Sequence, residues 1–284
     1  MSFYSNLLRL LPLTVNSSGT KHRMLIAAGK MLTAKSDNAT KYYTQFIQIT
    51  KHPCAEIIRY APYNFFRDFH RAALGRYMQS HLKPGQLFID IGANLGGYSM
   101  LAGELGCTVY NAEPEPSLSA FLKENEHCFG NHLTVALSDE EGTSEFFIAD
   151  KNLEGNSLVA SNKGWQHSGY SHSVQVRTAS FDQVLLPKVV KYNTPAFVKI
   201  DVEGNEEKVL RGMTQALQSD LIKNIWCEVR GPQSDRNANS YKAVCSLAEA
   251  NGYKSFVVDA YGHAQCFEEQ KHVRQFFDLL FVKD

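Results

Sequence analysis

The sequence lacks an excess of charge of either sign. Its 284 residues include 29 Lys and Arg against 29 Asp and Glu, so the formal net charge at pH 7 is zero. Proteins that hold nucleic acid or anionic membranes by charge carry a basic excess, and we therefore expect no nucleic-acid partner. Hydrophobic residues make up 44% of the chain and charged residues 20%, which favours a folded globular core over disorder.

Cysteine pairs and long apolar runs are absent too. The six cysteines form no C-x-x-C pair, so neither a zinc finger nor a disulfide framework is indicated. Scattered thiols fit a reducing compartment, and we expect a cytoplasmic protein. No stretch of the sequence approaches the roughly 18 apolar residues of a transmembrane helix. A short apolar stretch at residues 6–15 is interrupted by Arg9 and Pro12; we interpret it as a docking segment, which leaves a peripheral membrane contact open.

Residues 86–284 alternate apolar runs of strand length with helical patterns, which indicates a mostly parallel sheet covered on both faces. The expected strands are Leu87–Ile91, Val109–Ala112, Leu133–Leu137, Ala196–Asp201 and Ile225–Val229, followed by the edge strands Tyr253–Val258 and Phe276–Val282. The expected helices are Leu95–Leu105, Pro116–Phe129, Glu206–Leu217 and Asn239–Asn251. Two further strands, Glu145–Ile148 and Ser173–Arg177, flank a long loop. We predict an α/β fold with a seven-stranded sheet whose last strand is antiparallel.

Residues 1–85 have a more mixed pattern. We expect a helix at residues 21–34, strands at 45–50 and 55–60, and a helix from Asn64 to His81, before Pro84-Gly85 ends the section. This part is predicted to be a helical or mixed N-terminal extension, and 86–284 the main domain. The extension would serve as a lid over a binding site or as a homodimer contact, and the sequence does not decide between them.

The strongest functional signal is an apolar strand that ends in an acid and runs into a glycine turn, Asp90-Ile91-Gly92-Ala93-Asn94-Leu95-Gly96. Such a turn lets a ligand approach the backbone N–H groups at a helix N-terminus. The glycine spacing differs from the G-x-G-x-x-G of dinucleotide-binding proteins, and Asp90 would repel a pyrophosphate. The turn therefore suits a cationic or hydroxyl-bearing ligand, and the alternative is a tight turn with no ligand.

Glu113 ends the next expected strand, about twenty residues beyond the glycine turn, where an acid can accept hydrogen bonds from both hydroxyls of a ribose. Taken alone, Glu-Pro before a helix is more often a solvated charge that the helix dipole favours. Its spacing from the glycine turn nevertheless points to an adenosine ligand.

Four segments in this order, Phe88–Gly96, Glu113-Pro114, Ala136–Asp139 and Val198–Gly204, resemble the motifs of the FkbM family of S-adenosylmethionine-dependent methyltransferases. The similarity covers roughly residues 86–230, and an ordered set of motifs is more specific than one glycine loop. It implies a Rossmann-like class I methyltransferase fold, with the methyl donor S-adenosyl-L-methionine bound over the carboxyl ends of the strands.

The resemblance also implies which residues bind the donor. They are Asp90, Gly92, Asn94 and Gly96 at the methionine part, Glu113 at the ribose, and Ala136, Leu137 and Ser138 at the adenine. The chemistry is consistent with these roles, because Asp90 can pair with the donor's ammonium group and the apolar Ala136-Leu137 pair offers a flat surface to a purine.

Lys199, Asp201 and Glu203 alternate at the end of the fourth main strand, which places the three charges on one side. We expect Asp201 to act as general base or to orient the acceptor hydroxyl, with Glu203 or Lys199 setting its charge state. The alternative for Lys199 and Glu203 is an internal ion pair between Lys199 and a carboxylate, with Glu203 capping the following helix.

Further candidates for acceptor contacts are Glu228, which closes the fifth strand, and Asn156, Ser157 and His172 in and after the long loop. His167 and His172 are rival bases that are better interpreted as solvated loop residues. Asp201 and Glu228 offer two carboxylates to a divalent ion, but two ligands are too few to predict a metal.

These features predict an enzyme that transfers a methyl group from S-adenosyl-L-methionine to a hydroxyl of a sugar, in a glycolipid or polysaccharide, or of a natural-product alcohol. Two other classes stay open. A nicotinamide-dependent oxidoreductase is disfavoured by the glycine spacing, and a catalytically silent adenosine-binding or interaction module is disfavoured by Asp201. The sequence does not identify the acceptor, and transfer to nitrogen or carbon also stays open.

Overall fold

The computed structural model describes residues 72–149, 156–159, 170–231, 241–273 and 276–284. The chain divides into two compact units, Met1–Phe65 and Phe66–Asp284, and every described residue belongs to the second. The expected elements at 21–34, 45–50 and 55–60, the apolar stretch at 6–15 and His167 lie outside the described residues. Among those that are described, no helix has the length and apolar character needed to cross a membrane.

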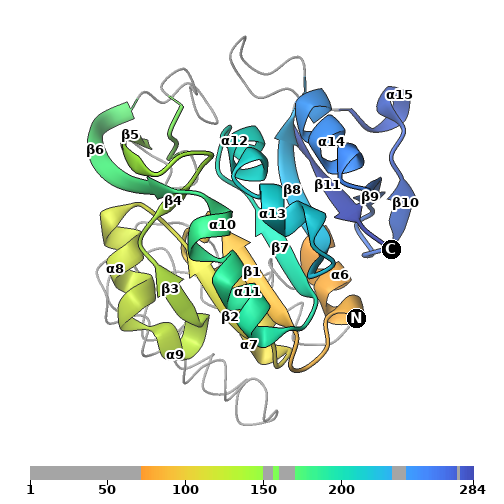
Figure 1. Ribbon diagram of the computed structural model, residues 1–284, viewed down its shortest axis with the longest axis horizontal. Coiled ribbons are helices and arrows are strands. Elements are labelled where there is room, and N and C mark those ends of the chain that lie inside the picture. Colours follow the sequence, from red (N-terminus) through yellow and green to blue (C-terminus); the bar gives the residue numbers. More distant parts are fainter. Residues whose placement is uncertain (1–71, 150–155, 160–169, 232–240, 274–275) are drawn as a thin grey trace, which may run out of the picture. The chain divides into compact units, whose positions relative to one another are not determined.

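The described part alternates helices and strands along the chain (Figure 1). The helices are α6 (Ala73–His81), α7 (Gly97–Glu104), α8 (Pro116–Glu124), α9 (Glu126–Phe129), α10 (Phe181–Val184), α11 (Leu186–Tyr192), α12 (Glu206–Arg211), α13 (Thr214–Gln218), α14 (Tyr241–Ala250) and α15 (Glu269–His272). The strands are β1 (Leu87–Ile91), β2 (Thr108–Ala112), β3 (Asn131–Leu133), β4 (Ala136–Leu137), β5 (Gly142–Ala149), β6 (Tyr170–Ala179), β7 (Ala196–Ile200), β8 (Ile222–Arg230), β9 (Lys254–Val258), β10 (Ala264–Cys266) and β11 (Phe276–Val282).

The main sheet has the strand order β10-β9-β11-β8-β7-β1-β2-β3. The five strands from β8 to β3 pair in parallel, and β11 runs antiparallel to both of its neighbours. The predicted mostly parallel α/β sheet is therefore confirmed. Two details differ from the expectation: β11 lies inside the sheet rather than at its edge, and the short strand β10 adds an eighth strand beyond β9.

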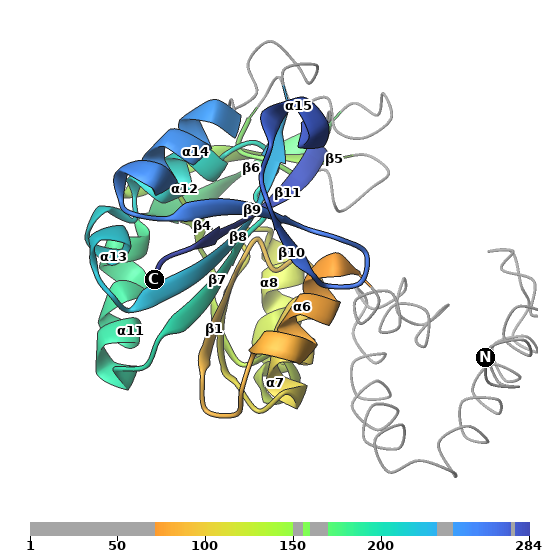
Figure 2. The ribbon, with the colours of Figure 1, turned by 90° about the vertical axis from the view of Figure 1, so that its right-hand side faces the viewer.

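The central strands are buried on both faces, which explains why they are continuous apolar runs. Alternate residues of β1 point to opposite sides: Phe88 packs in a core with α6 and α7, whereas Ile89 packs in the core that includes residues of α12, α13 and α14. Figure 2 shows the two groups of helices on opposite sides of the sheet. In α6 the side chains of Leu74, Tyr77 and Met78 pack against this sheet, so the described part of the helix expected at 64–81 belongs to the same compact unit as the sheet.

The segment Leu133–Leu137, expected as one strand, is divided between two sheets. β3 ends at Leu133 in the main sheet, and β4 pairs in parallel with β6 in a separate three-stranded sheet of order β4-β6-β5. Two expected helices are also divided, one at Asn125 and the other around Gly212. A Cβ on Gly212 would lie 2.1 Å from the backbone oxygen of Ser138. The break between α12 and α13 at this glycine therefore lets the backbone approach Ser138 closely.

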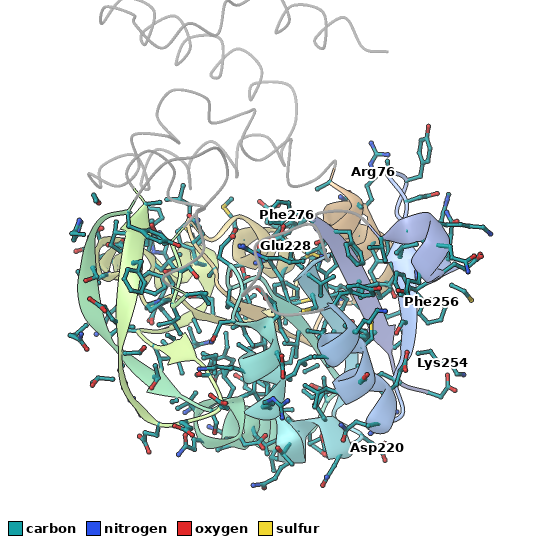
Figure 3. All side chains as sticks on the ribbon, turned by 90° about the horizontal axis from the view of Figure 1, so that it is seen from above. Arg76, Asp220, Glu228, Lys254, Phe256 and Phe276 are labelled. Carbon is teal, nitrogen blue, oxygen red and sulfur yellow. The ribbon has the colours of Figure 1, made fainter. Side chains whose placement is uncertain are left out.

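The sheet order places a switch point between β1 and β7, because the chain leaves β1 toward β2 and returns on the other side at β7. Ligands of open α/β sheets bind outside the carboxyl ends of the strands at such a point. Figure 3 shows the two ends of β8, with Asp220, which precedes the strand, at one edge of the molecule and Glu228 near the opposite edge. The side chains expected to be functional follow the strands at the Glu228 end.

Candidate active site

The glycine turn after β1 touches the end of β7. Gly92 has a φ of 75°, and a Cβ on it would lie 1.8 Å from the backbone oxygen of Asp201. Gly96 has a φ of 78°, and a Cβ there would lie 2.5 Å from the ring of Phe129. Positive φ values and this lack of space both require glycine. The turn therefore has a specific backbone shape, which ends at the N-terminus of α7.

Glu113, at the end of β2, closes this turn from the other side. Its carboxylate accepts hydrogen bonds from the backbone N–H of Asn94 at 2.9 Å and from that of Glu115 at 3.0 Å. Burial raises the pKa of Glu113 to about 7, although these two hydrogen bonds act in the opposite direction. The two sequence motifs thus meet, and each carboxylate oxygen keeps a lone pair for a further donor.

Lys199 links the glycine turn to Asp201. Its Nζ lies 3.2 Å from Asp90 Oδ1 and 3.3 Å from Asp201 Oδ2, and it donates to the backbone oxygen of Gly92 at 3.2 Å. Burial favours the neutral amine, but Asp201 and Asp90 outweigh it and raise the pKa of Lys199 above its ordinary value. The structure thus shows the internal ion pair that was the alternative for Lys199, and the charged ammonium is no proton acceptor.

The three partners of this ion-pair group differ in accessibility. The side chain of Asp90 is 1% exposed and that of Lys199 5%, whereas that of Asp201 is 36% exposed. Ser99 also donates to Asp90 Oδ2 at 2.7 Å. A donor ammonium would therefore have to share Asp90 with Lys199 and Ser99, and Asp201 is the acid of this group that a ligand reaches directly.

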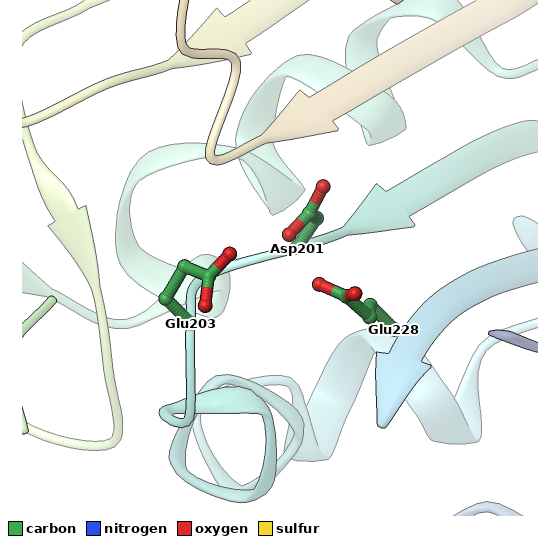
Figure 4. Close-up of side chains that lie close together, drawn as sticks. All are labelled: Asp201, Glu203 and Glu228. Carbon is green, nitrogen blue, oxygen red and sulfur yellow. The ribbon is translucent and has the colours of Figure 1, made fainter. Parts of the chain in front are cut away.

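Asp201 belongs to a cluster of carboxylates, shown in Figure 4, to which Glu203 and Glu228 contribute. One ligand oxygen from each of the three lies within 4.8 Å of the others. Burial and the neighbouring charges of Asp201 and Glu203 raise the pKa of Glu228 far above the carboxyl range, and Glu228 is hydrogen-bonded to Asp201. The Glu228 carboxyl therefore holds its proton more strongly than an ordinary carboxyl group and faces the Asp201 carboxylate.

Glu203 is held by different contacts from those expected. Its carboxylate pairs with Arg230 at 2.5 Å, and its backbone oxygen accepts a hydrogen bond from Ser157 Oγ at 2.7 Å. Glu203 does not cap the next helix: Glu206 Oε1 accepts from the Gly204 N–H at 2.9 Å instead. Burial and the nearby Asp201 raise the pKa of Glu203.

Two residues of this region were missed by the sequence reasoning. Arg230 lies two positions after Glu228 in β8, so alternation along the strand would have placed it on the same face. Asp278 lies directly opposite Glu228 in the antiparallel β8–β11 pair, and only the strand register reveals this. Burial and the proximity of Asp201 raise the pKa of Asp278 to about 6.

The other expected residues are dispersed. Ser157 reaches Glu203, and the neighbouring Asn156 is buried. Its Oδ1 accepts from the Ala149 N–H at 2.9 Å, and its Nδ2 has no hydrogen-bond partner among the described residues. His172 is exposed on β6, where its ring contacts the Ser171 hydroxyl. The side chains of Ala136 and Leu137 are buried in two hydrophobic cores, so little of either side chain is exposed.

Ser138, the third residue expected at the adenine, lines a hollow of about 510 Å³ between the three-stranded sheet and the start of α12. Polar side chains dominate its wall, among them Thr143, Asn205 and Lys208. Asn205 Nδ2 donates to the backbone oxygen of Leu137 at 3.0 Å, which holds the two sides of the hollow together.

Residues 90–255 match the family described as the methyltransferase FkbM domain, which is more than half of the chain. This protein is a member of the FkbM methyltransferase family. A curated relative, the hexuronic acid methyltransferase AglP of Haloferax volcanii, is 32% identical over 192 residues, covering 64% of this chain and 74% of the relative. The resemblance expected from the four motifs is thus confirmed.

Solved structures similar to this FkbM methyltransferase include a TehB-like SAM-dependent methyltransferase from Corynebacterium glutamicum, at 12% identity and a TM-score of 0.40 over 75% of this chain and 88% of the other. A magnesium protoporphyrin IX methyltransferase from Synechocystis is similar at 10% identity and a TM-score of 0.39, over 82% and 84% of the two chains.

Membership of the FkbM family makes this chain an S-adenosylmethionine-dependent methyltransferase with the class I fold. The family decides against the nicotinamide-dependent oxidoreductase that the strand and glycine turn alone had left open.

Proposed function

We propose that the protein transfers a methyl group from S-adenosyl-L-methionine to a hydroxyl oxygen of a sugar in a glycolipid or polysaccharide. The name of the relative AglP, a hexuronic acid methyltransferase, supports a carbohydrate acceptor. The observation that carries the proposal is Asp201, an accessible carboxylate that Lys199 fixes at the switch point of the sheet.

The residues around the glycine turn fit the donor. The turn exposes backbone to a ligand because Gly92 and Gly96 have no side chains, and α7 begins directly after it. Glu113 would hold the two ribose hydroxyls, since its carboxylate keeps one acceptor site on each oxygen. Asn94 has a φ of 50° and ties Glu113 to the turn. Ser138 would contribute to the adenine side from the wall of the hollow.

When bound, S-adenosyl-L-methionine supplies a methyl group on a positively charged sulfur. Asp201 would accept a hydrogen bond from the acceptor hydroxyl and hold its proton as the new O–C bond forms. The contacts with Lys199 and Glu228 would fix the direction of the Asp201 carboxylate. In-line transfer depends mainly on the alignment of the reacting atoms, because well-oriented reactants behave as if present at an effective concentration of about 10⁵ M or more. Orientation of the acceptor is therefore the larger proposed role of Asp201.

Asp201, Glu203 and Glu228 also have the oxygen chemistry that Mg²⁺ or Ca²⁺ prefers. Two of these carboxylates already have cationic partners, because Lys199 pairs with Asp201 and Arg230 pairs with Glu203. We therefore keep the expectation that transfer requires no metal, and a chelator tests it.

The proposed function is tested by incubating the full chain with the methyl donor and a panel of glycans that contains neutral sugars and hexuronic acids. We expect S-adenosylhomocysteine to form with at least one glycan, and NMR of the product to locate a new methyl group on a hydroxyl oxygen. A methyl group on nitrogen, on carbon or on a carboxylate would contradict the proposal, as would turnover only on acceptors that are not carbohydrates.

A further inference from the structure

Glu203 has a backbone conformation that its residue type disfavours. Its φ is 55°, in the left-handed region that non-glycine residues seldom adopt, and such a conformation persists only where its surroundings hold it. Two contacts from other parts of the chain do so: Ser157 Oγ donates to its backbone oxygen, and Arg230 binds its carboxylate. These contacts keep Glu203 in the carboxylate cluster.

Arg230 is itself fixed on two sides. Its side chain is 7% exposed and that of Glu203 is 13% exposed, so the pair is screened from solvent. The guanidinium lies over the ring of Phe276, 5.2 Å from the ring centre, and the two residues are directly opposite each other in the β8–β11 pair. A buried guanidinium is tolerated only with such partners. Arg230 thus connects Phe276 on one side to Glu203 of the carboxylate cluster on the other.

We propose that Arg230 is a positioning residue for methyl transfer, which acts by holding the Glu203 carboxylate beside Asp201 and Glu228. This inference rests on the proposed function, because it assigns Arg230 to the acceptor side of that site. Without Arg230, the Glu203 carboxylate would be repelled by Asp201 at short range, and the left-handed turn would lose the Arg230 contact that helps to hold it. The acceptor oxygen would then meet a differently arranged set of acids.

A double-mutant cycle tests whether Arg230 acts through Glu203. We expect Glu203→Gln and Arg230→Gln each to lower kcat about tenfold or more, the range for a lost orienting contact. In the double variant kcat should be no lower than in Glu203→Gln alone. The affinity for S-adenosylhomocysteine should stay within about twofold in all three, because the donor residues lie at the glycine turn and β2. Losses that multiply in the double variant would overturn the proposal.

Two further variants separate positioning from folding. Arg230→Lys keeps a buried cation but loses the planar fork of the guanidinium. We expect this variant to fold and to have a higher kcat than Arg230→Gln. Combined with Glu203→Gln, it should lower kcat no further than Glu203→Gln alone. Arg211→Gln is the matched control, because Arg211 pairs with Glu207 at 2.6 Å on the exposed side of α12; its kcat should change less than about twofold. If Arg211→Gln lowers kcat as much as Arg230→Gln, the inference is wrong.

Failure of the proposed function would look different from failure of this inference, because the unaltered chain would then methylate no sugar hydroxyl.

Discussion

The proposed donor side and the proposed acceptor side of the site owe their shapes to different chemical groups. Around β1 and β2 the shape comes from backbone: glycines with positive φ, and a Glu113 carboxylate that binds main-chain N–H groups. At the ends of β7 and β8 it comes from charged side chains, with two cations each holding a carboxylate. A shape made of backbone suits a ligand shared by a whole family, whereas a shape made of side chains varies with the acceptor.

The largest effect should come from removing the backbone shape. Gly92→Ala places a Cβ 1.8 Å from the Asp201 oxygen, and both the clash and the positive φ oppose it, so we expect a loss of about 3–5 kcal/mol in unfolding free energy. Gly85→Ala is the matched control, because Gly85 has a φ of 85° and open space around it; it should lose about 1–2 kcal/mol. Equal losses in thermal unfolding would show that the contact between the turn and β7 is unimportant.

A smaller effect is expected at Glu113. Glu113→Gln should weaken S-adenosylhomocysteine binding about tenfold, since one charged hydrogen-bond acceptor is lost, and should leave the fold intact. The unaltered protein should bind more tightly as pH rises through about 7 and level off above it, because two ribose hydroxyls require the ionised carboxylate, whose pKa is raised to about 7. Calorimetry from pH 5.5 to 8.5 checks this. The same pH dependence in Glu113→Gln would assign the titration to another group.

The smallest effect is expected from a chelator. Because Lys199 and Arg230 already contact the carboxylates of the acceptor side, EDTA should change the methyl-transfer rate by less than about twofold. A large loss that Mg²⁺ restores would instead make Asp201, Glu203 and Glu228 metal ligands. A bound metal ion, rather than Lys199 and Arg230, would then hold the carboxylates of the proposed acceptor side in place.

Most of the geometry of the proposed donor side could be predicted from the sequence, because its residues are close together along the chain. Gly92, Asn94 and Gly96 lie in one short turn, and the carboxyl end of the next parallel strand must bring Glu113 to the same edge. The residues expected at the adenine were harder to predict. Ala136 and Leu137 look like a free apolar pair in the sequence, but pairing of β4 with β6 buries them, and a two-residue strand that changes sheets has no periodic pattern to reveal it.

On the acceptor side the charges were visible but their partners were not. Lys199 and Asp201 alternate along the strand expected at Ala196–Asp201, so their proximity followed from strand geometry. The strand ends at Ile200, however, and Glu203 reaches the cluster through a left-handed turn that the sequence pattern does not show. Its partner Arg230 and the facing Asp278 come from strands whose register depends on the whole sheet.

We propose that Asp201 orients the acceptor hydroxyl. The direct test is a comparison of kcat for methyl transfer between Asp201→Asn and Asp220→Asn. Asp220 is 87% exposed at the opposite end of β8 (Figure 3). We predict that Asp201→Asn loses about 100-fold or more in kcat, the scale of general-base and orienting residues, and keeps its affinity for S-adenosylhomocysteine, whereas Asp220→Asn changes neither. Full turnover by Asp201→Asn would show that Asp201 does not orient the acceptor hydroxyl.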